Sequence, residues 1–378
     1  MEKITRQHPA LAKLKKRYPL TKNESSKDTW HVTLDIRDLP IEFHPGDSVG
    51  IHAQNDPILV SHLIEAMNAS PSDKIIHKRS GNEITLESFL KSRANLARIT
   101  SSFLKLIHAC EECPSTSQKI TDLLLPENKE RLRAFLSSSD PLHLLREYSK
   151  SKLPLQELCD RFGPLLPRFY SVASSRKTSE HELDLTVALF TWDQNGEKRY
   201  GVASHFLCHL AELEETPIPL FVQPAPHFRL PEDHATDLIM IGPGTGIAPF
   251  RAFLQERLHH SASGKHWLFF GERNASTDFF YREEWEQIPS LRLHTAFSRD
   301  REEKTYVQHR MLEQKKELYE WINRGAHLYV CGDAKVMAKD VHKTLIQILA
   351  DMGNIAEEEA KERLKALKKA GRYLLDVY

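Results

Sequence analysis

A strand that leads through a glycine-rich turn into a helix is the feature that most limits the fold of this chain. The segment reads Ile239-Met-Ile-Gly242-Pro-Gly244-Thr-Gly246-Ile-Ala-Pro249-Phe. Glycines let a backbone approach a pyrophosphate closely, and the free N–H groups at a helix start attract negative charge. The spacing is not G-x-G-x-x-G, so the ordinary dinucleotide fingerprint does not strictly apply. A tight turn that binds no ligand is the alternative.

The sequence after residue 231 alternates between short apolar runs and helical patterns. The runs cover residues 238–241, 267–270, 291–297 and 328–331, a charged amphipathic helix is expected over 357–369, and strand character returns over 372–378. Continuous apolar strands between helices are typical of a doubly wound parallel sheet. The pattern therefore predicts an α/β domain over residues 231–378.

The sequence before residue 231 has a different texture. Alternating residues over 30–36 and the turn and strand over 43–51 predict antiparallel strands, as do the segments 169–173, 183–190 and 218–222. Residues 57–158 show helical spacing and no clear strand. We therefore expect a multidomain β plus α/β fold, in which a helical insertion over 57–158 interrupts an antiparallel barrel formed by 30–56 and 159–230.

Composition excludes several classes of protein. Lys+Arg 52 balances Asp+Glu 52, so nothing global favours nucleic acid or an anionic membrane as partner. No apolar run approaches a membrane span and the first residues lack a signal-peptide core, so we expect a cytoplasmic protein. Five cysteines form one C-x-x-C pair, Cys110 and Cys113, and a single pair is poor evidence for zinc, so no metal is expected.

A basic loop follows the predicted strand over 291–297. It contains Ser298, Arg299 and Lys304, followed by Tyr306 and Gln308. Basic residues at such a strand end accommodate the 2′-phosphate of NADP, whereas NAD-selective folds place an acidic residue there. Solvated surface charge is the alternative interpretation.

The barrel region carries a second candidate phosphate site. Arg168 could neutralise a pyrophosphate, Gly201 could let N–H groups close on it at the head of a helix, and Tyr170 could lie against an aromatic ring system. A tyrosine buried in a strand is the plainer interpretation of Tyr170.

Several ordered motifs together resemble a known family. They are R-F-Y-S-V-A-S-S, G-V-A-S, G-P-G-T-G-I-A-P-F-R-A-F, F-F-G-E-R, S-R-D, K-T-Y-V-Q, Y-V-C-G-D-A and the ending R-Y-L-L-D-V-Y. This set resembles the FAD/NADPH module of diflavin reductases, a ferredoxin-NADP reductase-like family, and within it the sulfite reductase flavoproteins. The resemblance runs from about residue 30 to the end of the sequence, although the helical insertion matches only weakly.

The resemblance implies an FAD-binding antiparallel barrel with a helical connecting insertion, followed by an NADP-binding domain. It implies these FAD-binding residues: Arg168, Phe169, Tyr170, Ser171, Thr186, Val187, Ala188, Trp192, Gly201, Val202, Ala203, Ser204 and Tyr378. It implies these NADP-binding residues: Gly244, Thr245, Ser298, Arg299, Lys304, Thr305, Tyr306, Val307, Gln308 and Asp340.

The expected chemistry is hydride transfer from NADPH to FAD. The residues expected at the reacting rings are Ser171, Cys331 and Asp376, with the Tyr378 ring as a lid on the flavin. An inert core thiol is the plain alternative for Cys331, and a surface aspartate is the alternative for Asp376.

One departure from the family pattern concerns the start of the sequence. Diflavin reductases begin with an FMN-binding flavodoxin-like domain, and here about thirty residues precede the barrel, too few for such a domain. We therefore interpret residues 1–29 as a linker-like segment and expect FAD, NADPH and no FMN. Electrons would then leave to a separate acceptor, either a flavodoxin-like protein or a sulfite reductase haemoprotein. An NADPH-flavodoxin or ferredoxin-type reductase unconnected with sulfite, or a catalytically decayed flavin-bearing assembly subunit, are the alternatives.

Overall fold

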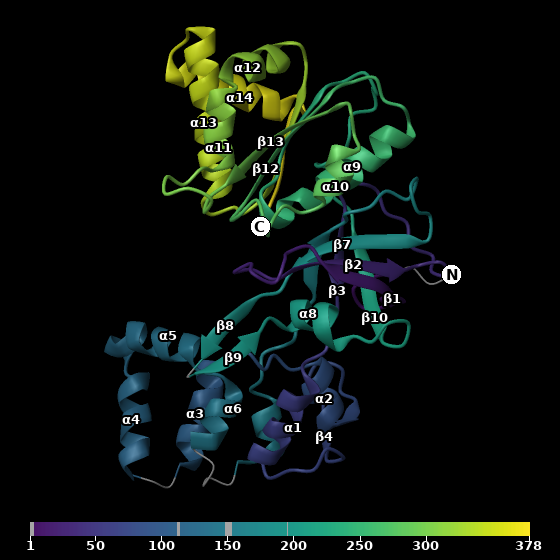
Figure 1. Cartoon of the computed structure of the whole chain (residues 1–378). Helices are drawn as coiled ribbons and strands as arrows, with labels where there is room; N and C mark the ends of the chain where they lie inside the picture. The colour runs from purple at the N-terminus through teal and green to yellow at the C-terminus, as the bar shows by residue number, and fades with distance from the viewer. Residues whose placement is uncertain (1–3, 112–113, 148–152, 195) are drawn as a thin grey trace. The chain divides into compact units, whose positions relative to one another are not determined.

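The computed structural model of the chain describes residues 4–111, 114–147, 153–194 and 196–378 (Figure 1). The chain divides into two compact units. The first unit comprises Met1–Ile51, Phe169–Leu189 and Ala211–Tyr378, and the second comprises His52–Arg168 and Phe190–Leu210.

An antiparallel sheet forms the first part of the first unit. Its strand order is β6-β3-β10-β1-β2-β7. The strands are β1 (Ala10–Pro19), β2 (Thr29–Asp35), β3 (Ser48–Ile51), β6 (Arg168–Ser171), β7 (Glu182–Ala188) and β10 (Pro217–Gln223). The register pairs Val32 with Leu185 and Leu34 with Leu183, and these side chains are fully buried. The predicted antiparallel sheet is thus confirmed.

A parallel sheet forms the rest of the first unit. Its order is β13-β12-β11-β14-β15, and all of its pairings are parallel. The strands are β11 (Leu238–Ile241), β12 (His266–Glu272), β13 (Leu291–Phe297), β14 (His327–Gly332) and β15 (Tyr373–Val377). Both faces of the inner strands are buried, which explains their continuous apolar runs. The predicted doubly wound sheet is confirmed.

Helices cover both faces of the parallel sheet (Figure 1). Leu238 and Met240 face a core with α9 (Ala248–His259) and α10 (Arg282–Glu286). Ile239 and Ile241 face the opposite core. The helices of that core are α11 (Val307–Glu313), α12 (Lys315–Asn323), α13 (Met337–Gly353) and α14 (Glu357–Lys369).

The second unit is largely helical and has its own apolar core, which includes Leu63, Leu90, Phe103 and Leu144. Its helices are α1 (Pro57–Ala66), α2 (Leu86–Ser92), α3 (Ser101–Cys110), α4 (Pro114–Leu124), η1 (Pro126–Asn128), α5 (Lys129–Ser138), α6 (Pro141–Glu147), α7 (Leu155–Cys159), α8 (Val202–His205) and the π-helix η2 (Phe206–Leu210). Two short hairpins belong to it, β4 (Lys74–Ile76) with β5 (Glu83–Thr85) and β8 (Thr191–Gln194) with β9 (Glu197–Tyr200).

Three expectations differ from these observations. The segment interpreted as a linker contains β1, which pairs with both β10 and β2. The region expected to lack strands contains the β4–β5 hairpin. Residues 190–210, which we assigned to the barrel, group with the helical insertion instead. The Cys110 and Cys113 pair cannot be placed as a whole, because Cys113 lies outside the described residues.

Candidate active site

The glycine turn has the geometry that a phosphate cradle requires. Its 3-10 turn η3 (Gly244–Ile247) follows β11 and leads directly into α9. Gly244 has φ +60, and a Cβ on Gly246 would lie 2.1 Å from the Cys331 carbonyl oxygen. The backbone of Gly244 favours glycine, and at Gly246 a side chain would collide with the end of β14, so the start of α9 lies directly against that strand end.

Three residues that are distant in the sequence meet at one carboxylate. The Ser171 Oγ donates to Asp376 Oδ2 at 3.1 Å, and Cys331 Sγ lies 3.8 Å from the same oxygen. Cys331 and Asp376 are register partners on the parallel strands β14 and β15, and Ser171 comes from the end of β6. The structure therefore brings together the three residues that we expected at the reacting rings.

Burial controls the protonation of this cluster. The pKa of the Cys331 thiol is raised well above its usual value, first by complete burial and then by the Asp376 carboxylate. Burial also raises the pKa of Asp376, although hydrogen bonds from Ser171 and Cys331 oppose the shift. Cys331 is consequently a neutral hydrogen-bond donor and not a thiolate.

The Tyr378 ring lies beside the glycine turn. Its hydroxyl is 2.9 Å from Thr245 Oγ1, and the residue is 63% exposed. The Tyr378 backbone continues the pairing of β15 with β14, because its N–H donates to the Gly332 carbonyl at 3.1 Å. The main chain is therefore held while the ring stays on the surface, an arrangement that permits movement of the ring alone.

The basic loop lies at the carboxyl end of β13. Ser298 Oγ donates to the Glu272 carbonyl at 3.3 Å, and Arg299 Nη1 donates to Ser26 Oγ at 3.2 Å. Within the described residues, Lys304 is exposed and forms no ion pair. Tyr306 is 43% exposed, so part of its side chain is accessible to a ligand.

The remaining residues expected at the nucleotide follow this loop. Thr305 is partly exposed and Val307 is buried in the core under α11. Gln308 donates to Asp340 Oδ2 at 3.4 Å, which joins α11 to α13. The Val307 side chain therefore packs in the core, whereas its neighbours remain near the surface.

A buried carboxylate near this loop, that of Glu272, was not among the site residues that we expected from the sequence. Glu272, at the end of β12, forms an ion pair with Lys27 and accepts from the Arg273 N–H at 2.8 Å. Arg273 also donates to Ser26 Oγ at 2.7 Å. The sequence signal that could have indicated Glu272 is its place as an acidic residue at the end of the second strand of a dinucleotide-binding fold.

Some flavin-binding candidates of the first unit have buried side chains and others have exposed side chains. Thr186 is buried and its hydroxyl is 2.7 Å from the Tyr281 hydroxyl, and Val187 is fully buried. Ala188 is exposed, and Phe169 is 51% exposed with its ring edge-to-face on Phe221. Thr186 and Val187 can therefore serve a ligand only through their backbone.

The flavin-binding candidates of the second unit surround a short helix start. Ser204 Oγ donates to the Gly201 carbonyl at 3.0 Å and accepts from the Phe190 N–H at 3.1 Å. Val202 and Ala203 form the first turn of α8. The Trp192 Nε1 donates to Gln194 at 2.9 Å, and its ring packs against Phe190 at 5.5 Å. Arg168 is exposed.

Phe190 is a candidate ligand contact that the sequence reasoning missed. Its ring is 65% exposed, although its backbone carbonyl accepts from the Gly201 N–H at 2.7 Å. An exposed aromatic ring beside a glycine-based helix start suits the stacking of a heterocycle. An aromatic residue at the end of the strand predicted over 183–190 was the available signal.

Comparison with known proteins gives the family. The model described as FAD binding domain matches residues 2–206, and the model described as oxidoreductase NAD-binding domain matches residues 240–343. The chain belongs to the FAD-binding domain family. Its carboxyl-terminal part is the NAD-binding domain of an oxidoreductase.

Several curated relatives of this FAD-binding protein share one name. The sulfite reductase [NADPH] flavoprotein alpha-component of Bacillus subtilis is 37% identical over 378 residues, 99% of this chain and 62% of the relative. The proteins of the same name from Vibrio cholerae and Shewanella oneidensis are 39% and 38% identical, over 60% and 61% of their lengths. The chain thus spans about 60% of the length of these relatives.

The residues present fit the two cofactors of the family. The turn has no room for a side chain at Gly246, and its backbone at Gly244 is left-handed, as in a glycine-based pyrophosphate site. The exposed Tyr306 ring and the cations Arg299 and Lys304 suit an adenosine 2′-phosphate. The exposed ring of Tyr378 in the first unit suits stacking on a flavin, and so, separately, does that of Phe190 in the second unit.

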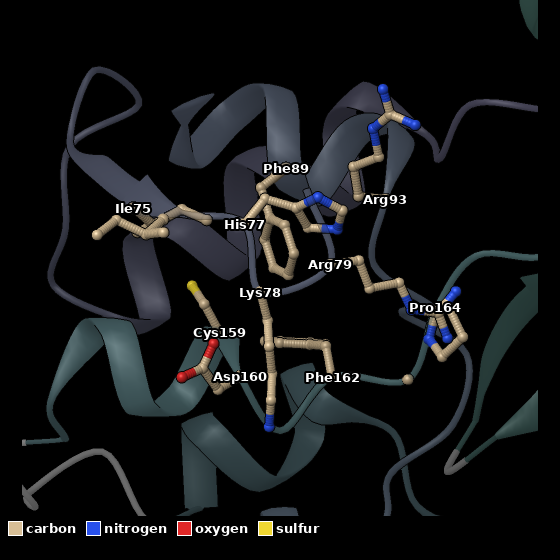
Figure 2. Close-up of a pocket in the computed structure, with 12 residues that line it drawn as sticks. Ile75, His77, Lys78, Arg79, Phe89, Arg93, Cys159, Asp160, Phe162 and Pro164 are labelled. Atoms are coloured by element: carbon tan, nitrogen blue, oxygen red, sulfur yellow. The ribbon is translucent and has the colours of Figure 1, made fainter. Parts of the chain in front are cut away.

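Two cavities lie in the second unit of the FAD-binding protein, and predicted flavin-binding residues line one of them. Figure 2 shows a cavity of about 110 Å³ in the second unit, where His77 and Phe89 lie above Asp160 and Lys78. None of the predicted site residues lines it. A larger cavity of the same unit, about 410 Å³, is lined by Trp192, Tyr200 and Val202.

Two further observations concern metals and membranes. The residues that the structure describes include no group of three or more His, Cys, Asp and Glu side chains that could hold a metal ion. No helix in the described part of the chain is long and apolar enough to cross a membrane.

Proposed function

We propose that this protein is an NADPH-dependent flavoprotein reductase that passes electrons from its FAD to a separate acceptor. The observation that carries the proposal is that Ser171 and Cys331 both contact one carboxylate oxygen of Asp376. Asp376 lies two residues before Tyr378 in the sequence. FAD, when bound, supplies a ring system that accepts a hydride from NADPH and releases electrons one or two at a time.

The cluster would orient and stabilise the reacting rings. Asp376 would supply negative charge next to the oxidised nicotinamide, and Ser171 and the neutral Cys331 thiol would hold that carboxylate in place. The partly exposed ring of Tyr378 would exclude water from the same site until the nicotinamide arrives.

The nucleotide would be held by its phosphates. The N–H groups of the Gly244–Ile247 turn and the Thr245 hydroxyl would bind the pyrophosphate. Ser298, Arg299 and Lys304 would bind the 2′-phosphate and so select NADPH over NADH. On the flavin side, Arg168 and the start of α8 at Gly201 would bind the FAD pyrophosphate, and Tyr170 would lie against the ring system.

The acceptor is the finer part of the proposal. The relatives are named as flavoprotein components of NADPH sulfite reductase, which supports a sulfite reductase haemoprotein or a flavodoxin-like protein as the acceptor. Reduction of a ferredoxin-type protein unconnected with sulfite is the competing outcome.

Anaerobic reduction tests the proposal directly. The purified protein should be yellow, its bound flavin should be FAD, and its visible flavin absorbance should bleach with NADPH. A protein that binds FAD but is not bleached by NADPH would refute reductase activity and favour a decayed subunit. Adding oxidised flavodoxin or haemoprotein to the reduced protein then identifies which acceptor restores the yellow colour.

A further inference from the structure

A buried polar network connects the antiparallel sheet to the helices of the nucleotide-binding part, within the first unit. Its centre is Arg251, on α9, and its other members lie on β2, β7 and at α10. These members are His31, Thr33, Asp184, Thr186, Tyr281 and Glu284.

The guanidinium of Arg251 donates hydrogen bonds to three separate segments of the chain. Its Nη1 donates to Asp184 Oδ2 and to the Ala173 carbonyl, both at 2.8 Å, and its Nε donates to Glu284 Oε2 at 2.7 Å. The Arg251 side chain is only 10% exposed. Such a fork fixes angles as well as distances, which a lysine ammonium does not.

Asp184 is held from the sheet side as well. Its Oδ1 accepts from the Thr33 hydroxyl at 2.7 Å and lies 3.3 Å from His31 Nε2. Every strong contact of this carboxylate therefore comes either from a neighbouring strand or from Arg251. A buried ion pair of this kind contributes little net stability, but it permits only one geometry, because any other leaves a buried charge unpaired.

Tyr281 closes the network. Its hydroxyl is 2.7 Å from Thr186 Oγ1 and 3.1 Å from His31 Nδ1, and the Arg251 guanidinium lies 4.9 Å from its ring centroid. Tyr281 has φ 55, a left-handed conformation that is uncommon for a residue with a side chain. Such strain of about 1–3 kcal/mol persists only where the surroundings fix the conformation, as these contacts do.

A second row of bonds runs parallel to the network. The Ser175 N–H donates to Gln255 Oε1 at 2.9 Å, and the Ser175 hydroxyl bonds to Glu256. Gln255 and Glu256 lie on α9, one turn beyond Arg251. The segment after β6 is thus attached to α9 over two successive turns.

Both ends of the Arg251 and Asp184 pair lead to a proposed cofactor site. Arg251 lies in the first turn of α9, directly after the glycine turn proposed for the NADP pyrophosphate. Asp184 lies on β7, two residues before Thr186, the first residue of the part of this strand that is proposed to border the flavin. This hydrogen-bonded ion pair therefore gives a short side-chain path from one proposed site to the other.

We propose that Arg251 is a positioning residue for hydride transfer, which sets the nucleotide-binding turn at a fixed distance from the flavin-binding strand through Asp184 and the Ala173 carbonyl. The inference rests on the proposed function. Its physical basis is that a misplacement of about 1 Å between reacting groups can cost on the order of a hundredfold in rate.

Arg251→Met is the test, and Arg257→Met is its matched control. Arg257 is also a buried arginine of α9, but it bonds to the Thr236 carbonyl at 2.8 Å and to His266 at 3.1 Å, on the parallel-sheet side only. Stopped-flow reduction of the bound FAD at saturating NADPH gives the rate of the hydride step. Calorimetry with 2′,5′-ADP gives the affinity of the nucleotide end without any turnover.

Arg251→Met should slow flavin reduction about tenfold to a hundredfold. FAD content and the 2′,5′-ADP dissociation constant should stay within about threefold, because neither site loses a contact. Arg251→Lys should recover part of the rate, and Arg257→Met should stay within about threefold of the wild type. Hydrogen exchange should rise at residues 173–175 and 184–186 in Arg251→Met but not in Arg257→Met.

A wild-type rate in Arg251→Met, or an equal loss in Arg257→Met, would overturn the proposal. If Arg251→Met does not fold, Tyr281→Phe removes the two hydroxyl contacts and keeps the ring. This variant should slow flavin reduction about threefold to tenfold at unchanged 2′,5′-ADP affinity, and an unchanged rate would count equally against the network. Failure of NADPH to reduce the wild type would refute the proposed function alone, since the hydrogen exchange result depends on no turnover.

Discussion

Removal of the Tyr378 ring should change which nucleotide the protein uses. The nicotinamide must lie flat against the flavin for hydride transfer, and the family resemblance places the Tyr378 ring on that same flavin face. In the structure the ring is 63% exposed and its hydroxyl is 2.9 Å from Thr245. Displacement of the ring would therefore break the bond to Thr245 and the stacking on the flavin that the resemblance implies.

The magnitude follows from these two contacts. A hydrogen bond at a surface contributes about 0.5–1.5 kcal/mol and aromatic stacking about 0.5–1.5 kcal/mol beyond burial. Displacement then costs about 1–3 kcal/mol, which corresponds to about fivefold to a hundredfold in the population of the open site. NADPH can offset this cost through its 2′-phosphate contacts, whereas NADH cannot.

Tyr378→Ala should therefore raise kcat for NADH by about fivefold or more. For NADPH it should raise kcat less, or lower it, because a nicotinamide that stays stacked delays release of NADP. Steady-state kinetics with both nucleotides and a one-electron artificial acceptor measures the two values. Tyr378→Phe is the control, since it loses only the Thr245 bond and should show the smaller part of the effect. An unchanged ratio of kcat for NADH and NADPH in Tyr378→Ala would refute the reasoning.

Three further outcomes are expected. Arg299→Ala should lower kcat/KM for NADPH about tenfold or more and leave NADH nearly unchanged, because a charge-assisted contact to phosphate contributes about 1.5–3 kcal/mol, and Arg301→Ala on the same loop should affect neither nucleotide. Acid extraction and chromatography should release FAD, and FMN at comparable stoichiometry would contradict the single-flavin assignment. Burial raises the pKa of Asp184, but His31 and Arg251 outweigh it and hold the value at about 2, below the ordinary 3.8. The carboxylate then stabilises the fold above about pH 4, and roughly 2 kcal/mol should be lost as pH falls from there to about 2; urea unfolding at several pH values should show this loss in the wild type and not in Asp184→Asn.

The parallel sheet was predictable because burial leaves a direct mark on its sequence. β11 and β12 are buried on both faces, so each appears as an uninterrupted apolar run between helical patterns. The sequence signal for β1 is much weaker. Ala10, Ala12 and Leu14 point inward, but the outward residues are mostly lysines and no β-branched residue is present, so pairing with β2 and β10 decides its conformation.

Some parts of the candidate site could likewise be predicted from the sequence, and others could not. The glycine turn could be found from local sequence, because Gly244 has a left-handed backbone that favours glycine and Gly246 lies too close to β14 for a side chain. The meeting of Ser171 with Asp376 could not, since it depends on how β6 and β15 come together, and only the family resemblance indicated it. The Arg251 network was not predicted at all. Its members lie on separate segments, and each one alone is an ordinary polar residue.

The protonation of the ring cluster limits what its cysteine can do. A thiol acts as a nucleophile only as a thiolate, and complete burial beside the Asp376 carboxylate keeps Cys331 protonated. The same carboxylate oxygen faces both the thiol and the Ser171 hydroxyl, so the proton of each is directed toward it. Cys331 and Ser171 therefore act as paired donors that fix one aspartate oxygen in space. In the proposed reaction the cluster would favour hydride transfer through orientation and charge, which is the role that a flavin-dependent reaction leaves to the protein.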